Sequence, residues 1–124
     1  MSSILIVDDE PVVRALLRAA LEPTGSRILA AGDGSEAVEL AWRERPDLVL
    51  LDVALPRLNG MDACRAMKTN PSPPRVLLVT GSPDEVDVEG CGADGVIGKP
   101  LPMPELFSIV MDQLAACANP NSED

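Results

Sequence analysis

Short apolar runs alternate along the chain with segments in which apolar residues recur at helical spacing, and this alternation predicts the secondary structure. Residues 4–7 (ILIV) and 48–51 (LVLL) are continuous apolar runs, a pattern typical of strands that are buried on both faces. The pattern predicts strands at residues 4–7, 27–31, 48–51, 75–80 and 95–98, and helices at residues 11–22, 36–45, 61–68 and 104–117.

Turn-forming residues set the ends of these helices. Pro11 suits a first helical turn, where its missing N–H costs nothing, and the sequence Pro23-Thr24-Gly25 ends the first helix. We expect Ser35 to be the N-cap of the second helix, because its hydroxyl can accept a free backbone N–H.

The stretch between Thr80 and Gly92 is too short and too acidic for a full helix. Gly81, Pro83 and Gly90 leave only residues 84–89, which include four acids and two valines. Helix nucleation is costly for so short a piece, and its helix propensity is poor. We therefore expect a single turn or an irregular loop here.

The order of the elements implies an α/β fold, a doubly wound parallel sheet of five strands with helices on both faces. A chain of 124 residues, 46% apolar and 24% charged, forms one soluble domain. We expect this domain to span residues 1–117, and residues 118–124 to be a flexible polar tail. We expect neither a secretory signal nor a membrane span, which needs roughly 20 apolar residues.

Charge and side-chain chemistry exclude several classes of function. The formal net charge of −10 repels nucleic acid, so we expect no direct contact with DNA or RNA. These residues include no histidine, which excludes His-based zinc sites, His-dependent triads and a phosphohistidine carried by them. The three cysteines, Cys64, Cys91 and Cys117, show no paired or metal-type spacing, and this favours a reduced, cytoplasmic setting.

Polar side chains follow four of the five predicted strands at their carboxyl ends. They are Asp8 with Asp9, Asp52, Thr80 and Lys99. In doubly wound sheets, ligands bind beyond the carboxyl ends of the strands, at the point where the strand order reverses. These five residues are therefore the candidate site.

The three aspartates converge if the first and third strands are neighbours, as they are in the strand order 2-1-3-4-5. Clustered carboxylates repel and need a cation to stay ionised together, and oxygen ligands select a hard ion, Mg²⁺ or Mn²⁺. Such a cation, the Lys99 ammonium and the Thr80 hydroxyl would surround one carboxylate with groups that bind a phosphoryl group. Asp52 is the central acid and so the natural nucleophile.

Five motifs at strand ends together resemble the response-regulator receiver domain of two-component signalling. They are Asp8-Asp9-Glu10-Pro11, Leu51-Asp52-Val53 with Pro56 and Gly60, Thr80-Gly81, Gly92-Ala93-Asp94-Gly95 and Lys99-Pro100. The resemblance covers the chain from Ile4 to Leu114. It implies a flavodoxin-like, CheY-like fold with the strand order 2-1-3-4-5.

The resemblance also implies the roles of the acidic residues. Asp52 is expected to be the phosphoacceptor. Asp9 is expected to ligate Mg²⁺ directly and Asp8 largely through water. The backbone carbonyl of Ala54 is expected to be a further metal ligand.

Two further roles, and one departure, follow from the same resemblance. Thr80 is expected to contact the phosphoryl oxygens and to move on activation, and Lys99 to pair with the phosphate. The bond from Lys99 to Pro100 is expected to be cis. Family members commonly carry Tyr or Phe three residues before the lysine, whereas this chain has Val96. The usual rotation of a large ring is therefore not available.

These expectations favour a single-domain receiver that takes a phosphoryl group from a sensor histidine kinase or a phosphotransfer protein. The 124 residues contain no output domain, so we expect a protein effector on another chain, and no enzyme activity beyond self-catalysed phosphotransfer and autodephosphorylation. The alternative is a receiver-fold interaction module whose output does not depend on phosphorylation, which Val96 and the short segment motivate. An aspartyl phosphatase is disfavoured because Val53-Ala54 offers no second acid, and a flavin site because the acidic pair would repel a phosphate.

The last predicted helix has a wide apolar face. At 100° per residue its apolar positions cover an arc of about 200°, wider than one-sided burial requires. Such a face is either fully covered within the domain or forms a surface for a partner, including a homodimer.

Overall fold

The computed structural model describes residues 2–118. Residues 119–124 of the expected tail lie outside the described residues. Within these residues, five strands and five α-helices alternate, joined in two places by 3₁₀ turns at Glu22–Thr24 and Pro83–Glu85. The strands are β1 (Ser3–Val7), β2 (Arg27–Ala31), β3 (Leu48–Asp52), β4 (Arg75–Thr80) and β5 (Gly95–Gly98). The helices are α1 (Pro11–Leu21), α2 (Gly34–Glu44), α3 (Gly60–Met67), α4 (Val88–Cys91) and α5 (Met103–Ala118).

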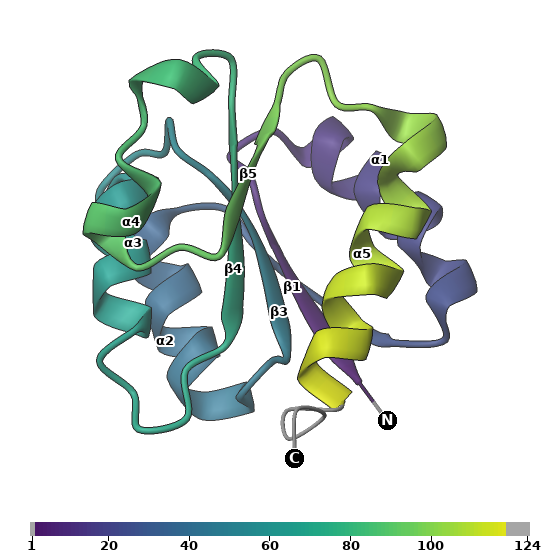
Figure 1. Cartoon of the computed structure of the whole chain (residues 1–124), viewed down its shortest axis with the longest axis horizontal. Coiled ribbons are helices and arrows are strands. Elements are labelled where there is room, and N and C mark those ends of the chain that lie inside the picture. The colour runs from purple at the N-terminus through teal and green to yellow at the C-terminus, as the bar shows by residue number, and fades with distance from the viewer. Residues whose placement is uncertain (1, 119–124) are drawn as a thin grey trace.

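The strands form one parallel sheet in the order β2-β1-β3-β4-β5, which confirms the expected doubly wound topology. Helices α1 and α5 cover one face of the sheet, and α2, α3 and α4 cover the other (Figure 1). The chain leaves β1 and β3 toward opposite faces of the sheet. The carboxyl ends of these two neighbouring strands therefore form the switch point at which ligands bind in such sheets.

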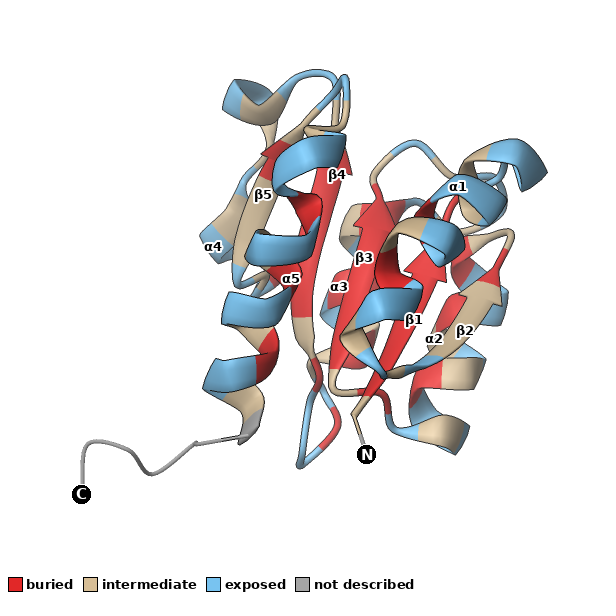
Figure 2. Cartoon of the chain, turned by 90° about the vertical axis from the view of Figure 1, so that its right-hand side faces the viewer, coloured by how far each residue is buried: buried red, intermediate tan, exposed pale blue. Residues whose placement is uncertain are grey.

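Each face of the sheet has its own apolar core. Side chains that alternate along the central strands point to opposite faces, so β1 and β3 supply both cores. Figure 2 shows both of these strands coloured as buried. Cys64 and Met67 of α3 and Cys91 of α4 are buried in the core under α2, α3 and α4. The core under α1 and α5 consists of aliphatic side chains, among them Leu17, Leu21, Leu106, Val110 and Leu114.

The N-terminus of α2 differs from the sequence prediction. Asp33, not Ser35, is the N-cap, and its carboxylate accepts the backbone N–H of Glu36 at 2.8 Å. The helix begins two residues earlier than predicted because Gly34 packs directly against the backbone of Leu58, where any Cβ would collide with the Leu58 carbonyl oxygen. Ser35 is exposed in the first turn.

The segment between Thr80 and Gly92 contains only single turns, which confirms the prediction. A 3₁₀ turn at Pro83–Glu85 is followed by α4, a helix of four residues. The sequence treated Gly90 as a helix breaker, but the structure places it inside α4. Asp87 makes this possible because its carboxylate caps the turn by accepting the N–H of Gly90 at 2.9 Å.

Asp94 fixes the start of β5 to the start of β4. Its carboxylate accepts the backbone N–H of Val76 at 2.8 Å and the Lys68 ammonium at 2.7 Å. Its own N–H donates to the Val76 carbonyl at 2.8 Å, and Lys68 also donates to the Pro74 carbonyl at 2.7 Å. The downstream end of the short α4 segment is therefore firmly held.

The wide apolar face of α5 is only partly covered. Leu106, Val110 and Leu114 are buried against the sheet, whereas Phe107 and Met111 are exposed. No helix among residues 2–118 is long and apolar enough to cross a membrane.

Candidate functional site

Asp8 and Asp9 follow β1 directly, where the buried apolar strand reaches the edge of the sheet. Asp8 is buried, and its carboxylate accepts the backbone N–H of Glu10 at 2.9 Å. The Arg14 guanidinium donates to the Asp8 carbonyl oxygen at 2.6 Å and so ties this turn to α1. Asp9 is exposed, and its carboxylate lies near that of Asp8.

Asp52 is the last residue of β3 and is also buried. One carboxylate oxygen, Oδ1, accepts the backbone N–H of Ala54 at 3.1 Å, and Oδ2 accepts the Lys99 ammonium at 3.2 Å. Gly60 packs against the backbone behind this carboxylate, and its N–H donates to the Val53 carbonyl at 2.9 Å. A Cβ at Gly60 would collide with the Asp52 carbonyl oxygen, so the loop after β3 can close here only with glycine.

The three aspartates converge as predicted. One carboxylate oxygen from each of Asp8, Asp9 and Asp52 lies within 4.8 Å of the others. Burial raises the pKa of Asp8 above its ordinary value, and the neighbouring Asp52 carboxylate raises it further, against the lowering effect of the Glu10 N–H. An oxygen-only cluster of this kind, with two of its three carboxylates buried, fits a hard divalent cation, which would relieve the repulsion among the carboxylates.

Thr80 ends β4 and Lys99 directly follows β5, at the same edge of the sheet. The Lys99 N–H donates to the Thr80 carbonyl at 2.8 Å, and this backbone bond joins the ends of the two strands. The Thr80 hydroxyl accepts the N–H of Ser82 at 3.0 Å. The Lys99–Pro100 peptide bond is cis, as expected.

The structure thus brings the three aspartates and the Lys99 ammonium together and places Thr80 at the same edge of the sheet, and it adds one side chain and one backbone group that the sequence did not indicate. Arg14 holds the turn after β1, and the Ser82 N–H orients the Thr80 hydroxyl. In the sequence, Arg14 cannot be distinguished from any other surface arginine on an amphipathic helix. Its contact with a backbone carbonyl six residues earlier depends on how α1 departs from the sheet, which the sequence pattern does not encode.

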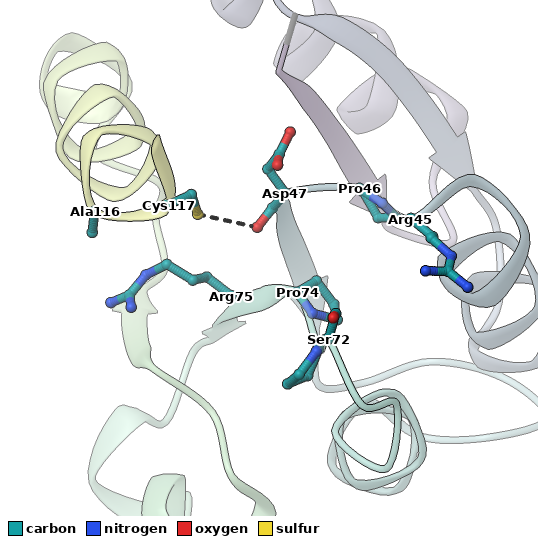
Figure 3. Close-up of a pocket in the computed structure, with 9 residues that line it drawn as sticks. Arg45, Pro46, Asp47, Ser72, Pro74, Arg75, Ala116 and Cys117 are labelled. Carbon is teal, nitrogen blue, oxygen red and sulfur yellow. Dashed lines mark hydrogen bonds between the residues drawn. The ribbon is translucent and has the colours of Figure 1, made fainter. Parts of the chain in front are cut away.

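A cavity of about 610 Å³ lies at the opposite end of the strands (Figure 3). It is lined by Asp47 and Arg75, which precede or begin β3 and β4, and by Cys117 of α5, whose thiol donates to the Asp47 carbonyl at 3.3 Å. It contains none of the acidic cluster, so the candidate chemistry and this cavity belong to different edges of the sheet.

Comparison with known proteins agrees with this geometry. Residues 4–111 match the profile of the response regulator receiver domain. The chain belongs to this family. Its acidic cluster, threonine and lysine at the carboxyl edge of a parallel sheet are therefore features of a receiver domain from a two-component response regulator.

The curated relatives of this receiver domain include regulators named for transcription or DNA binding. The chain is 39% identical over 107 residues to the probable transcriptional regulatory protein TcrX of Mycobacterium tuberculosis, covering 84% of this chain and 46% of that protein. It is 40% identical over 114 residues to the DNA-binding response regulator MtrA of Mycolicibacterium smegmatis, covering 90% of this chain and 50% of MtrA. The chain thus spans about half the length of these relatives.

Solved structures give the same fold. The receiver domain of the sensor histidine kinase PA1611 from Pseudomonas aeruginosa, with a magnesium ion coordinated in its active-site cleft, superposes with a TM-score of 0.83 at 29% identity, covering 92% of this chain and 98% of that one. A receiver domain of a histidine kinase from Syntrophus aciditrophicus gives a TM-score of 0.84 at 36% identity, with 94% and 92% covered.

Proposed function

We propose that this receiver domain accepts a phosphoryl group on Asp52 from the phosphohistidine of a sensor histidine kinase or phosphotransfer protein. The observation that carries the proposal is the convergence of three carboxylates with the Lys99 ammonium, 3.2 Å from Asp52. Asp52 alone among the three aspartates contacts Lys99 in this structure. It is also the central acid, between the acidic pair and the lysine.

In the transfer step, a carboxylate oxygen of Asp52 attacks phosphorus, and the P–O bond forms as the donor's P–N bond breaks. The electron pair of that bond returns to the imidazole nitrogen of the donor. A bound Mg²⁺ would supply positive charge to the phosphoryl oxygens. Lys99, now paired with Asp52, adds a fixed positive charge, and the Thr80 hydroxyl can donate a hydrogen bond to a phosphoryl oxygen.

The metal would be held by oxygen atoms of the site. Asp9 would ligate it directly and Asp8 largely through water, with Asp52 and the backbone carbonyl of Ala54 completing the protein ligands. The raised pKa of Asp8 supports this assignment. It shows that the ionised carboxylate is destabilised in the folded protein, and a bound cation would gain affinity by relieving that cost. Mn²⁺ has the same preference for oxygen and would substitute.

The output of the domain is proposed to be a contact with a protein effector in the cytoplasm, with no enzyme activity beyond phosphotransfer and autodephosphorylation. Since relatives include DNA-binding regulators, the absence of nucleic-acid contact stays a prediction about these 124 residues, supported by their net charge of −10. The alternative, a module that signals without phosphorylation, is motivated by Val96 in place of the usual aromatic residue and by the short segment between Thr80 and Gly92.

The test is intact-mass measurement after incubation with a small phosphodonor such as acetyl phosphate, with and without Mg²⁺. We expect one added phosphoryl group that requires Mg²⁺ and is lost in Asp52→Asn. The matched control is Asp84→Asn, an exposed acid in the neighbouring loop, which should be phosphorylated like the wild type. A phosphoryl group retained in Asp52→Asn would place the nucleophile elsewhere. No modification of the folded wild type would favour the alternative.

A further inference from the structure

Arg14, near the start of α1, is a half-buried side chain that contacts the turn between β1 and α1. Its guanidinium donates to the Asp8 carbonyl oxygen at 2.6 Å. This carbonyl belongs to the peptide group that joins Asp8 to Asp9, so the two acids lie at either end of the group that Arg14 binds. One hydrogen bond therefore acts on the orientation of two proposed metal ligands.

The other hydrogen bonds of this turn hold Asp8 and do not hold Asp9. The Asp8 N–H donates to the Ala31 carbonyl of β2 at 3.2 Å, and the Asp8 carboxylate accepts the Glu10 N–H at 2.9 Å. In the described part of the chain, Asp9 makes no hydrogen bond to another backbone group. The contact with Arg14 is therefore the hydrogen bond that sets the plane of the peptide group leading into Asp9.

Gly32 leaves room for this guanidinium at the end of β2. Polar side chains follow the other four strands, whereas β2 ends at Ala31 and is followed by glycine. A Cβ at Gly32 would lie 3.3 Å from Nη1 of Arg14, closer than an ordinary van der Waals contact. The guanidinium therefore lies between the Asp8 carbonyl and the Gly32 backbone, and a side chain at position 32 would press on it.

We propose that Arg14 is a positioning residue for the divalent cation of the acidic cluster. The inference rests on the metal site proposed above, and it gives Arg14 no contact with the ion. Arg14 fixes the peptide group between Asp8 and Asp9, and so holds the two carboxylates in the arrangement that the ion binds. Removal of a group that holds metal ligands in place typically costs about 10–100-fold in metal affinity.

The charge of Arg14 acts in the opposite direction to its hydrogen bond. A positive charge near a cation site repels the ion, so loss of the charge alone would strengthen Mg²⁺ binding. This repulsion is screened by salt, whereas a half-buried hydrogen bond from a charged donor is strong and is screened much less. We therefore expect positioning to outweigh repulsion, and the sign of the change in affinity distinguishes the two effects.

Titration of the ¹⁵N-labelled 124-residue chain with Mg²⁺, followed by amide NMR, measures the dissociation constant. We expect Arg14→Gln to raise this constant about tenfold, because the shorter side chain cannot hold the Asp8 carbonyl. Arg14→Lys keeps the charge and one donor, and should restore part of the affinity. The matched control is Arg18→Gln on the same helix. It removes a guanidinium that donates to the Ile28 carbonyl at 3.3 Å, and should leave the constant unchanged.

The Asp9 amide gives a readout that a general loss of stability would not move. The Asp8 carbonyl and the Asp9 N–H belong to one peptide group, so loss of the hydrogen bond at the carbonyl shields the Asp9 nitrogen. Its ¹⁵N resonance should move to lower chemical shift in metal-free Arg14→Gln and should stay in place in Arg18→Gln. Thermal unfolding of each metal-free variant checks that the compared chains are folded.

Gly32→Val tests the same contact without removing a charge. The new side chain presses on the guanidinium, so we expect weaker Mg²⁺ binding, and little further loss when it is combined with Arg14→Gln, because both changes break one contact. Arg14→Gln that binds Mg²⁺ as tightly as the wild type overturns the proposal, as does an equal loss in Arg18→Gln; both results leave the metal site standing. A wild type that binds no Mg²⁺ overturns the metal assignment and this inference together.

Discussion

At the scale of single residues, Asp8 is buried and its pKa is raised, for two reasons. Burial removes water from its carboxylate, and Asp52 adds a second negative charge nearby. Because the folded-state pKa lies above the unfolded value, the folded protein loses stability as Asp8 ionises, that is, as the pH rises through the carboxyl range. The site therefore carries an electrostatic cost at neutral pH until a cation binds.

Asp8→Asn is predicted to stabilise the metal-free domain at pH 7. The amide oxygen can still accept the Glu10 N–H, while the ionisation cost disappears. We expect a gain on the order of 1 kcal/mol in the free energy of unfolding by urea. The gain should vanish when the pH falls below the ordinary value of 3.8, where Asp8 is protonated in both states. A variant less stable than the wild type at pH 7 would contradict this account.

At the scale of elements, Gly60 shows how a backbone contact fixes the site. Gly60→Ala is predicted to destabilise the domain by roughly 1–3 kcal/mol, because the new methyl group collides with the Asp52 carbonyl oxygen and must push the loop away from β3. Unfolding by urea measures the loss. The control is Gly81→Ala, where a Cβ meets nothing within 4 Å, and this variant should stay within about 0.5 kcal/mol of the wild type.

The segment from Gly81 to Gly92 is predicted to carry the conformational response. Val96 has no ring to rotate, and its single χ1 torsion sweeps a small volume, so β5 can change little when Thr80 moves. The segment has only short turns and mostly exposed residues, so local rearrangement costs little there. Amide exchange with and without beryllofluoride and Mg²⁺ should show its largest change within residues 81–92. Changes confined to α1 or α2 would refute the prediction.

The elements were predictable where the pattern is strong and local. The bounds of β2, β4 and β5 are those that the sequence predicts, because apolar runs there meet glycine, proline or charge at both ends. The start of α2 was not predictable, because Asp33 and Ser35 are both good N-cap residues. The contact of Gly34 with Leu58 decides between them. That contact joins two loops distant in sequence, and no local pattern records it.

The site was predictable because a parallel sheet collects the ends of its strands. Once strand order was taken from the family resemblance, Asp8, Asp9 and Asp52 had to meet at one edge, with Thr80 and Lys99 beside them. The partial exposure of α5 was less accessible to sequence analysis. A wide apolar arc is the same whether a neighbouring element covers it or leaves it open, and only the placement of α1 settles how much is covered.

At the scale of the whole molecule, bound Mg²⁺ is predicted to stabilise the fold, because it binds the folded cluster and not the unfolded chain. At a concentration 100-fold above its Kd the gain is about 2.7 kcal/mol, which raises the Tm by several degrees. Thermal unfolding with increasing Mg²⁺ measures it. Asp9→Ala removes a ligand and one repelling charge, so its Tm should not respond to Mg²⁺. An Mg²⁺ response unchanged in Asp9→Ala would remove Asp9 from the ligand set.

The tie that Asp94 makes to β4 has a consequence for the distant lysine. Strand β5 is a spacer of four residues between Asp94, which is anchored to Val76, and Lys99, which contacts Asp52. Extended chain advances about 3.3 Å per residue, so one residue inserted into or deleted from β5 would carry the ammonium by that length and turn it to the other face of the sheet. The distance between the Lys99 ammonium and the Asp52 carboxylate therefore depends on the anchor that Asp94 makes at the other end of β5.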